Sequence, residues 1–350
     1  MALSFKLFTM SKNPFEQPIK REEPPIKEMK EKLDKAEKMV EEVKERWKDK
    51  IEEFEMVEKT VEKSVKELKR LWEENEGKIK RRYEIFSFFY SLPLPEVPSS
   101  LLERISNKFL KEFDWEKFER RRHLDKDLGL FLSAFLKKNV ENYILSQKRK
   151  GLKEDQIKPI EVYLKVRRAP IILSMLGCQN HAKLHLIIEG DSRDFTGTKM
   201  QGGEIVVKGD CGNWIGEEMQ GGKIIIERSC EYGIGEGMQG GKIIVERNCG
   251  DDTGIGMQGG EIVVKGDCGN WIGEEMQGGK IIIEGSCGGC AGKYMQGGEL
   301  NIKGEVESFD KSAFSSNNQG TIIWKRTKIW ENGDWTKEGK EMKEKGEIPV

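Results

Sequence analysis

A four-residue motif, Met-Gln-Gly-Gly, recurs in this chain at a constant spacing of 19 residues. The six copies begin at Met200, Met219, Met238, Met257, Met276 and Met295. A unit this short cannot bury an apolar face by itself and must stack on its neighbours, as the units of a solenoid do. Residues 200–298 are therefore predicted to form a tandem array of one structural unit.

Each repeat continues from the motif into a short apolar run, such as Glu204–Lys208 or Lys223–Glu227. The run is too short for a helix and is rich in β-branched residues, so it is predicted to be a strand. Stacking one coil on the next at about 4.8 Å gives a parallel β-helix. Weaker copies at Ile187–Asp191 and Asn301–Gly304 extend the array. We place the β-helix at residues 159–325, with about eight coils in a rod roughly 38 Å long.

Residues 200–227 recur without a change at 257–284, three coils later. A recent internal duplication accounts for this identity. The second interpretation is a functional spacing, in which a patch such as Asn213–Trp214 is displayed again at Asn270–Trp271.

The glycine pattern from Gly202 to Gly222 resembles the GXGXG domain of the large glutamate synthase subunit. It is also similar to one of the subunits of formylmethanofuran dehydrogenase. The resemblance covers about residues 170–325 and implies a right-handed β-helix that serves as a scaffold and spacer without catalytic residues. The chain lacks the nucleophilic Cys at position 2 and the iron–sulfur cysteine cluster of glutamate synthase. We therefore expect no enzyme activity, no cofactor and no small-molecule substrate.

Five of the seven cysteines share the 19-residue period and are predicted to stack as a ladder inside one corner: Cys211, Cys230, Cys249, Cys268 and Cys287. A small, soft side chain suits such a corner, and reduced thiols are typical of the cytoplasm. Cys287 and Cys290 form a Cys-x-x-Cys, a spacing that also occurs in redox and zinc sites. A zinc site needs two more ligands, and the histidines are only His123, His181 and His185. We predict no metal.

Residues 26–92 have a different pattern, in which apolar residues recur every three or four positions between Glu and Lys. This predicts a long amphipathic helix with a narrow, coiled-coil-like stripe. The stripe residues predicted to mediate dimerisation are Leu33, Val40, Val43, Trp47, Phe54, Val61, Val65 and Leu68. Self-association through this helix is the first expectation, and an intrachain hairpin broken near Gly77 is the alternative.

Residues 99–150 are predicted to form a small helical bundle. Ser100–Glu103 is a capping-box signature, and Asp114 can begin another helix that runs through Arg122. The expected core is Leu101, Leu102, Ile105, Phe109, Leu110, Phe113, Trp115, Phe118, Leu130, Phe131 and Phe135.

The charge of the chain is unevenly distributed. Residues 1–170 hold 40 basic and 33 acidic residues, whereas residues 171–350 hold 20 and 28. The basic clusters are Lys80, Arg81 and Arg82; Arg120, Arg121 and Arg122; Lys148, Arg149 and Lys150; and Arg167 and Arg168. Clusters of this kind can bind phosphate backbones, structured RNA in particular. They can equally be solvated faces, because charged residues make up 35% of the chain, as in heat-adapted proteins.

Both ends are predicted to be arms. Residues 1–25 contain four prolines and lack the apolar core of a signal peptide. Thr321–Trp330 is predicted to be a final strand, with a charged tail at 326–350. No segment has the apolar length of a membrane span, so we expect a cytoplasmic protein.

Two classes of function remain. In the first, the chain is a non-catalytic homodimeric assembly factor, and its whole arrangement resembles archaeal ribosome dimerisation factors. This resemblance implies binding to small-subunit RNA and proteins, joining of two small ribosomal subunits, and silenced translation in hibernation. In the second, the β-helix is a scaffold subunit of a multi-subunit oxidoreductase related to glutamate synthase or formylmethanofuran dehydrogenase.

Overall fold

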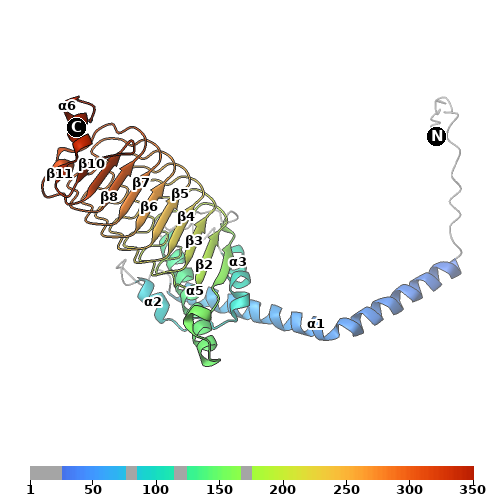
Figure 1. The fold of residues 1–350 in the computed structure, drawn as a ribbon. Coiled ribbons are helices and arrows are strands. Elements are labelled where there is room, and N and C mark those ends of the chain that lie inside the picture. The colour runs from blue at the N-terminus through green and yellow to red at the C-terminus, as the bar shows by residue number, and fades with distance from the viewer. Residues whose placement is uncertain (1–25, 76–84, 114–123, 167–175) are drawn as a thin grey trace, which may run out of the picture. The chain divides into compact units, whose positions relative to one another are not determined.

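The computed structural model describes residues 26–75, 85–113, 124–166 and 176–350 (Figure 1). It divides the chain into two compact units, Met1–Glu58 and Lys59–Val350, which are treated separately below. The predicted arm at residues 1–25 and the predicted helix at 114–122 lie outside the described residues. None of the helices within these ranges combines the length and apolar character needed to cross a bilayer.

The helical part of the chain is built from α1 (Ile26–Asn75), α2 (Ile85–Ser91), α3 (Leu102–Lys111) and α5 (Leu124–Arg149). Single 3-10 turns precede α3 and follow α5, at Ser99–Leu101 and Glu154–Gln156. The residues of α1 up to Glu58 belong to the first unit, and those from Lys59 onward belong to the second.

An aromatic core holds the helices of the second unit together. The ring of Trp72, near the end of α1, lies 6.1 Å from Phe89 of α2 and 5.7 Å from Phe131 of α5, centroid to centroid. Phe109 of α3 lies 5.9 Å from Phe131. Most of the predicted bundle core is buried, namely Leu102, Ile105, Phe109, Leu110, Leu130, Phe131 and Phe135. Leu101 and Phe113 are half-buried, and Trp115 and Phe118 lie outside the described residues.

The second unit continues into a solenoid. Its parallel strands are β1 (Ile160–Leu164), β2 (Leu184–Ile188), β3 (Glu204–Val207), β4 (Lys223–Ile226), β5 (Lys242–Val245), β6 (Glu261–Val264), β7 (Lys280–Ile283), β8 (Glu299–Ile302) and β9 (Thr321–Trp324). From β3 to β8 each residue pairs with the residue 19 positions later, without a shift in register. The predicted fold class, N-terminal helices followed by a parallel β-solenoid of 19-residue coils, is confirmed.

The repeated motif builds the interior of the solenoid. Alternate strand residues such as Ile224 and Ile226 point inward and are fully buried, and so are the motif methionines Met219 and Met238. Gly241, the second glycine of its motif, has φ +86°, and a Cβ there would lie 2.7 Å from both the Gly222 carbonyl oxygen and Cε of Met219. Only glycine adopts this conformation and leaves the methionine its place.

Both ends of the sheet are covered. At the first end α3 packs on β1, and the Asn107 side chain donates to the Tyr163 carbonyl (2.6 Å) and accepts from the Lys165 amide (2.8 Å). The other end carries β10 (Thr327–Glu331), β11 (Asp334–Trp335) and α6 (Lys337–Glu344). Such caps occupy the backbone groups that an open edge would expose.

The C-terminal segment differs from the sequence expectation. Thr321–Trp330 is not a single strand, because β9 and β10 form an antiparallel pair in which Thr327 lies opposite Trp324. The residues after it do not extend as an arm, since α6 packs on β10 and the Phe309 amide donates to the Pro349 carbonyl (2.7 Å). Buried Trp330 and half-buried Phe314 belong to the aromatic cluster that holds this return, at 5.8 Å between ring centroids.

Candidate interaction surfaces

The outward side chains of the solenoid sheet form one surface, which we call the outer face. Figure 1 shows the arrows of β4 to β8 stacked side by side with no helix drawn over them. A central column of half-buried side chains runs across these strands, and it consists of Val206, Ile225, Ile244, Val263, Ile282 and Asn301. The outer face therefore presents a mainly apolar stripe to its surroundings.

Charged residues flank this stripe on both sides. The first flank, at the start of each strand, consists of Glu204, Lys223, Lys242, Glu261, Lys280 and Glu299. The second flank, directly after each strand, consists of Lys208, Glu227, Glu246, Lys265, Glu284 and Lys303. Ion pairs join neighbouring coils within each flank, for example Lys242–Glu261 at 2.6 Å and Lys265–Glu246 at 2.5 Å.

Acidic and amide side chains at the corners hold successive coils together. The Asp191 carboxylate accepts a hydrogen bond from the Asp210 amide of the next coil (2.9 Å), and Asp210 accepts from the Ser229 amide (3.0 Å). Asp251 accepts in the same way from Asn270 (2.7 Å). These side chains replace backbone partners at the turns, which is a structural role.

The predicted cysteine ladder is confirmed. The five periodic cysteines are buried and free, and Cys211 and Cys230 face each other in a parallel bridge. Burial raises the pKa of the Cys287 thiol to about 12, and that of Cys178 to about 12 as well. Cys290 is half-exposed. Within the described ranges, no three His, Cys, Asp or Glu side chains lie together as metal ligands.

The duplicated segments have different surroundings. Trp214 stacks on Phe195 at 4.8 Å between ring centroids, with 10° between the planes, and Tyr232 meets it edge-on at 4.9 Å. Trp271, its counterpart, is 37% exposed. The 19-residue period could have predicted the contact of Phe195 with Trp214, because the two residues are 19 positions apart. The two identical segments, however, do not present the same aromatic patch twice.

The structure describes one of the four basic clusters. Lys148, Arg149 and Lys150 are exposed at the end of α5, and Lys148 forms an ion pair with Glu154 (2.8 Å). Basic residues there also suit the negative end of the helix dipole. The remaining clusters, Lys80–Arg82, Arg120–Arg122 and Arg167–Arg168, lie outside the described residues.

The predicted dimerisation stripe on α1 is divided between two environments. In the first unit Leu33, Val40 and Phe54 are 59%, 52% and 60% exposed. The side chains of Val43 and Trp47 lie outside the described residues. In the second unit Val61, Val65 and Leu68 are buried within the chain. The stripe that remains accessible to a partner is therefore its N-terminal part.

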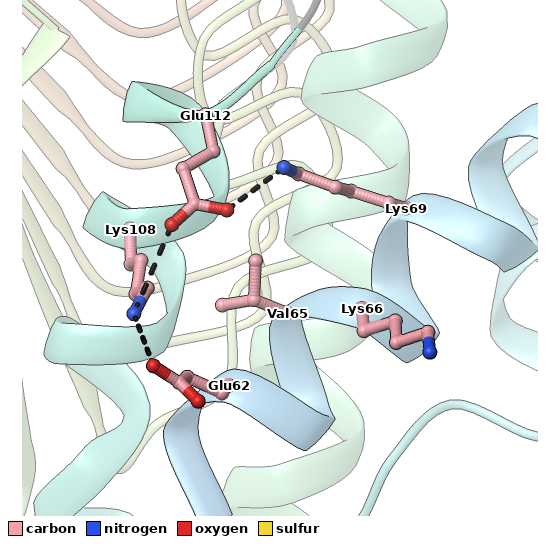
Figure 2. A pocket seen from close by; sticks show the side chains of 6 residues that line it. All are labelled: Glu62, Val65, Lys66, Lys69, Lys108 and Glu112. Atoms are coloured by element: carbon pink, nitrogen blue, oxygen red, sulfur yellow. Dashed lines mark hydrogen bonds and ion pairs between the residues drawn. The ribbon is translucent and has the colours of Figure 1, made fainter. Parts of the chain in front are cut away.

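A pocket of about 300 Å³ lies between α1 and α3 in the second unit (Figure 2). Glu112 receives a hydrogen bond from Lys69 (2.8 Å), which lowers the pKa of its carboxyl group. Lys108 bridges Glu112 and Glu62 at 3.8 and 3.6 Å. Figure 2 shows the Lys66 ammonium directed away from these carboxylates. The acids are already paired, so the pocket is a charged contact between helices, and neither it nor the Asn107 cap was predicted from the sequence.

Comparison with known proteins adds one match. Residues 151–327, which contain the strands β1 to β9 and most of their corners, match the family model described as the GXGXG motif. No curated protein matches the chain.

Proposed function

The chain belongs to the GXGXG motif family, and we propose that it is a non-catalytic scaffold that works as a homodimer and holds other macromolecules together. One observation carries this proposal. The repeated polar residues of the solenoid are used between coils, in the corner hydrogen bonds and in the ion pairs of the two flanks. A rod stiffened along its whole length suits a spacer between partners.

Family membership favours one class of partner. The GXGXG domain of glutamate synthase is the part of the large subunit that the sequence resembles, and there it serves as scaffold and spacer. The first candidate is therefore a scaffold subunit of a multi-subunit oxidoreductase. On this proposal the partners supply the flavin, iron–sulfur or other chemistry, and this chain supplies their spacing.

Charge favours a second candidate. The excess of basic residues lies in the first 170 residues, and the described cluster Lys148–Lys150 is exposed. Such a distribution suits a phosphate backbone. On this proposal the dimer is cytoplasmic, binds RNA and proteins of the small ribosomal subunit, pairs two subunits and prevents their joining to large subunits.

Sedimentation of a cell lysate at moderate and high salt tests the proposal. We expect the chain to migrate in a defined assembly larger than its own dimer, and that assembly to fall apart when the chain is depleted. Migration of all the chain as free monomers or dimers would overturn the scaffold function, and so would substrate turnover by the purified chain alone.

A matched pair of variants separates the two candidates. The first changes Lys148, Arg149 and Lys150 to Glu, and the second makes the same change in charge at exposed Lys311, Lys337 and Lys345. If small ribosomal subunits are the partner, only the first variant lowers affinity, by roughly 10-fold or more, and it flattens the salt dependence. Equal affinity for both variants, with co-migration of a coloured enzyme complex, favours the oxidoreductase scaffold.

A further inference from the structure

The two flanks of the outer face follow a rule across the strand. From β3 to β8, whenever the first-flank residue is acidic the second-flank residue is basic, and the reverse. Glu204 is matched with Lys208, and Lys242 with Glu246. β1 obeys the rule as well, with Glu161 before its centre and Lys165 after its end. Because β6 and β7 duplicate β3 and β4, they are not independent cases. The rule still holds in five strands of separate sequence, β1, β3, β4, β5 and β8.

Contacts within the chain do not require this rule. The ion pairs of the face run along a flank, from one coil to the next, as in Lys223–Glu204 (3.1 Å) and Lys280–Glu299 (2.9 Å). The two flank residues of one strand are four residues apart, which is about 13 Å, too far for a direct pair. Ion pairing along each flank therefore leaves the relative sign of the two flanks free.

We propose that the outer face is an interface with a second copy of this chain, related by a two-fold axis that runs parallel to the stacking direction of the coils. This axis sets each coil against the same coil of the partner and reverses the strand direction. Each first-flank residue then faces a second-flank residue, so Lys242 faces the partner's Glu246 and Glu261 faces the partner's Lys265. Every flank pair from β3 to β8 is of opposite charge, on both sides of the axis.

The other face-to-face arrangement lacks this complementarity. A two-fold axis along the strands sets the first flank against itself with the order of coils reversed. Centred on β3 to β8, it would place Glu204 against the partner's Glu299 and Lys223 against the partner's Lys280, and only the middle pair, Lys242 and the partner's Glu261, would have opposite charges. Like charges in direct opposition destabilise an interface.

The apolar stripe and the size of the face fit the same occupant. In the proposed arrangement the axis passes over the central column, so Ile244 meets the partner's Ile244 across the two sheets. The nine strands β1 to β9 at about 4.8 Å, each about 13 Å wide, offer roughly 560 Å² per copy. The total of roughly 1,100 Å² clears the minimum of about 1,000 Å² for a biological interface. The inference rests on the self-association included in the proposed function and assigns that contact to the solenoid.

Charge exchanges within one flank test the rule without disturbing the chain's own ion pairs. The first variant carries Lys242→Glu and Glu261→Lys, and the second carries Glu246→Lys and Lys265→Glu. Each variant keeps its net charge and its coil-to-coil pairs with reversed sense. Each also brings like charges together at four places across the two-fold axis. We expect the dimer dissociation constant of either variant to rise by at least about 10-fold.

Mixing the two variants provides the rescue. In a mixed dimer every exchanged residue again faces the opposite charge, so the equimolar mixture should regain the affinity of the unchanged chain. A variant with all four substitutions should regain it alone. Sedimentation velocity of the full chain measures the dimer, and thermal unfolding by circular dichroism checks that each variant is folded.

A background with Leu33, Val40, Val43, Trp47 and Phe54 changed to Ser removes the N-terminal part of the predicted α1 stripe, so that it does not mask the result. A dimer that tolerates each exchange, or a mixture without rescue, overturns the interface. A dimer lost in this background alone assigns self-association to α1, which overturns the interface and leaves the proposed function intact. An unchanged chain that is monomeric overturns both.

Discussion

At the scale of the residue, the second glycine of the motif that begins at Met238 has two separate roles. Gly241 must adopt φ +86°, and it must leave space for Cε of Met219. Gly256, which directly precedes the motif methionine Met257, has φ +60° but nothing within 4 Å of the position where a Cβ would lie. The coils that carry Glu218 and Glu275 at the corresponding place have similar φ values of 51° and 55°. The two glycines therefore separate backbone strain from loss of space.

We expect Gly241→Ala to lower the free energy of unfolding by about 2–4 kcal/mol, because a strained backbone and a steric clash add together. Gly256→Glu, which inserts the residue found in other coils, should cost only about 1 kcal/mol. Chemical denaturation of the full chain measures both. Equal losses for the two variants would show that the Met219 side chain and the Gly222 carbonyl both make room for the added methyl group at little cost.

At the scale of the element, the first strand of the sheet depends on one amide from a helix. Asn107 of α3 satisfies the Tyr163 carbonyl and the Lys165 amide, at the edge of β1 that pairs with none of the strands the structure describes. Without that side chain, the edge exposes a donor and an acceptor. The helical bundle is therefore part of the solenoid's stability.

Asn107→Ala should weaken the attachment of α3 to β1 by about 1–3 kcal/mol, because two backbone groups lose their partners. Hydrogen exchange should accelerate in β1 and much less in β5. Lys111→Ala, an exposed change on the same helix, is the control and should leave exchange in β1 as it was. Unchanged protection of β1 in the Asn107 variant would assign the edge contact to the rest of α3.

At the scale of the whole molecule, the cysteine ladder couples the stability of the rod to pH. Burial raises the pKa of Cys287 from 9.0 to about 12, so the folded chain keeps this proton at a pH where the unfolded chain releases it. The stabilising contribution is complete below about pH 9 and is lost as the pH rises towards 12. The pKa values of Cys211 and Cys268, two other buried thiols of the ladder, are raised as well.

Cys287→Val removes one titrating group. It introduces valine, the residue type that the next coil carries at the paired position, Val306. Between pH 9 and 11 the unchanged chain should lose about 2–3 kcal/mol more than this variant. Denaturant midpoints across that interval measure the difference. Parallel curves for the two proteins would mean that the thiol at position 287 ionises as readily in the folded chain as in the unfolded one.

The 19-residue period by itself determined the solenoid, its strands and the cysteine ladder. A repeat makes each of these contacts recur between residues a fixed distance apart in the sequence, so pattern and contact coincide. The same period explains the coil-to-coil ion pairs, because Lys242 and Glu261 are 19 residues apart.

Only the tertiary structure decided which parts of the α1 stripe are available, how Asn107 closes the sheet edge and how the C-terminal residues return to the rod. Val61 and Phe54 occupy similar positions in one amphipathic pattern, yet the first is buried and the second exposed. These contacts join segments of unrelated sequence, and their energy depends on which surfaces meet in three dimensions. No local period carries that information, whereas a repeating array carries its own contacts in its spacing.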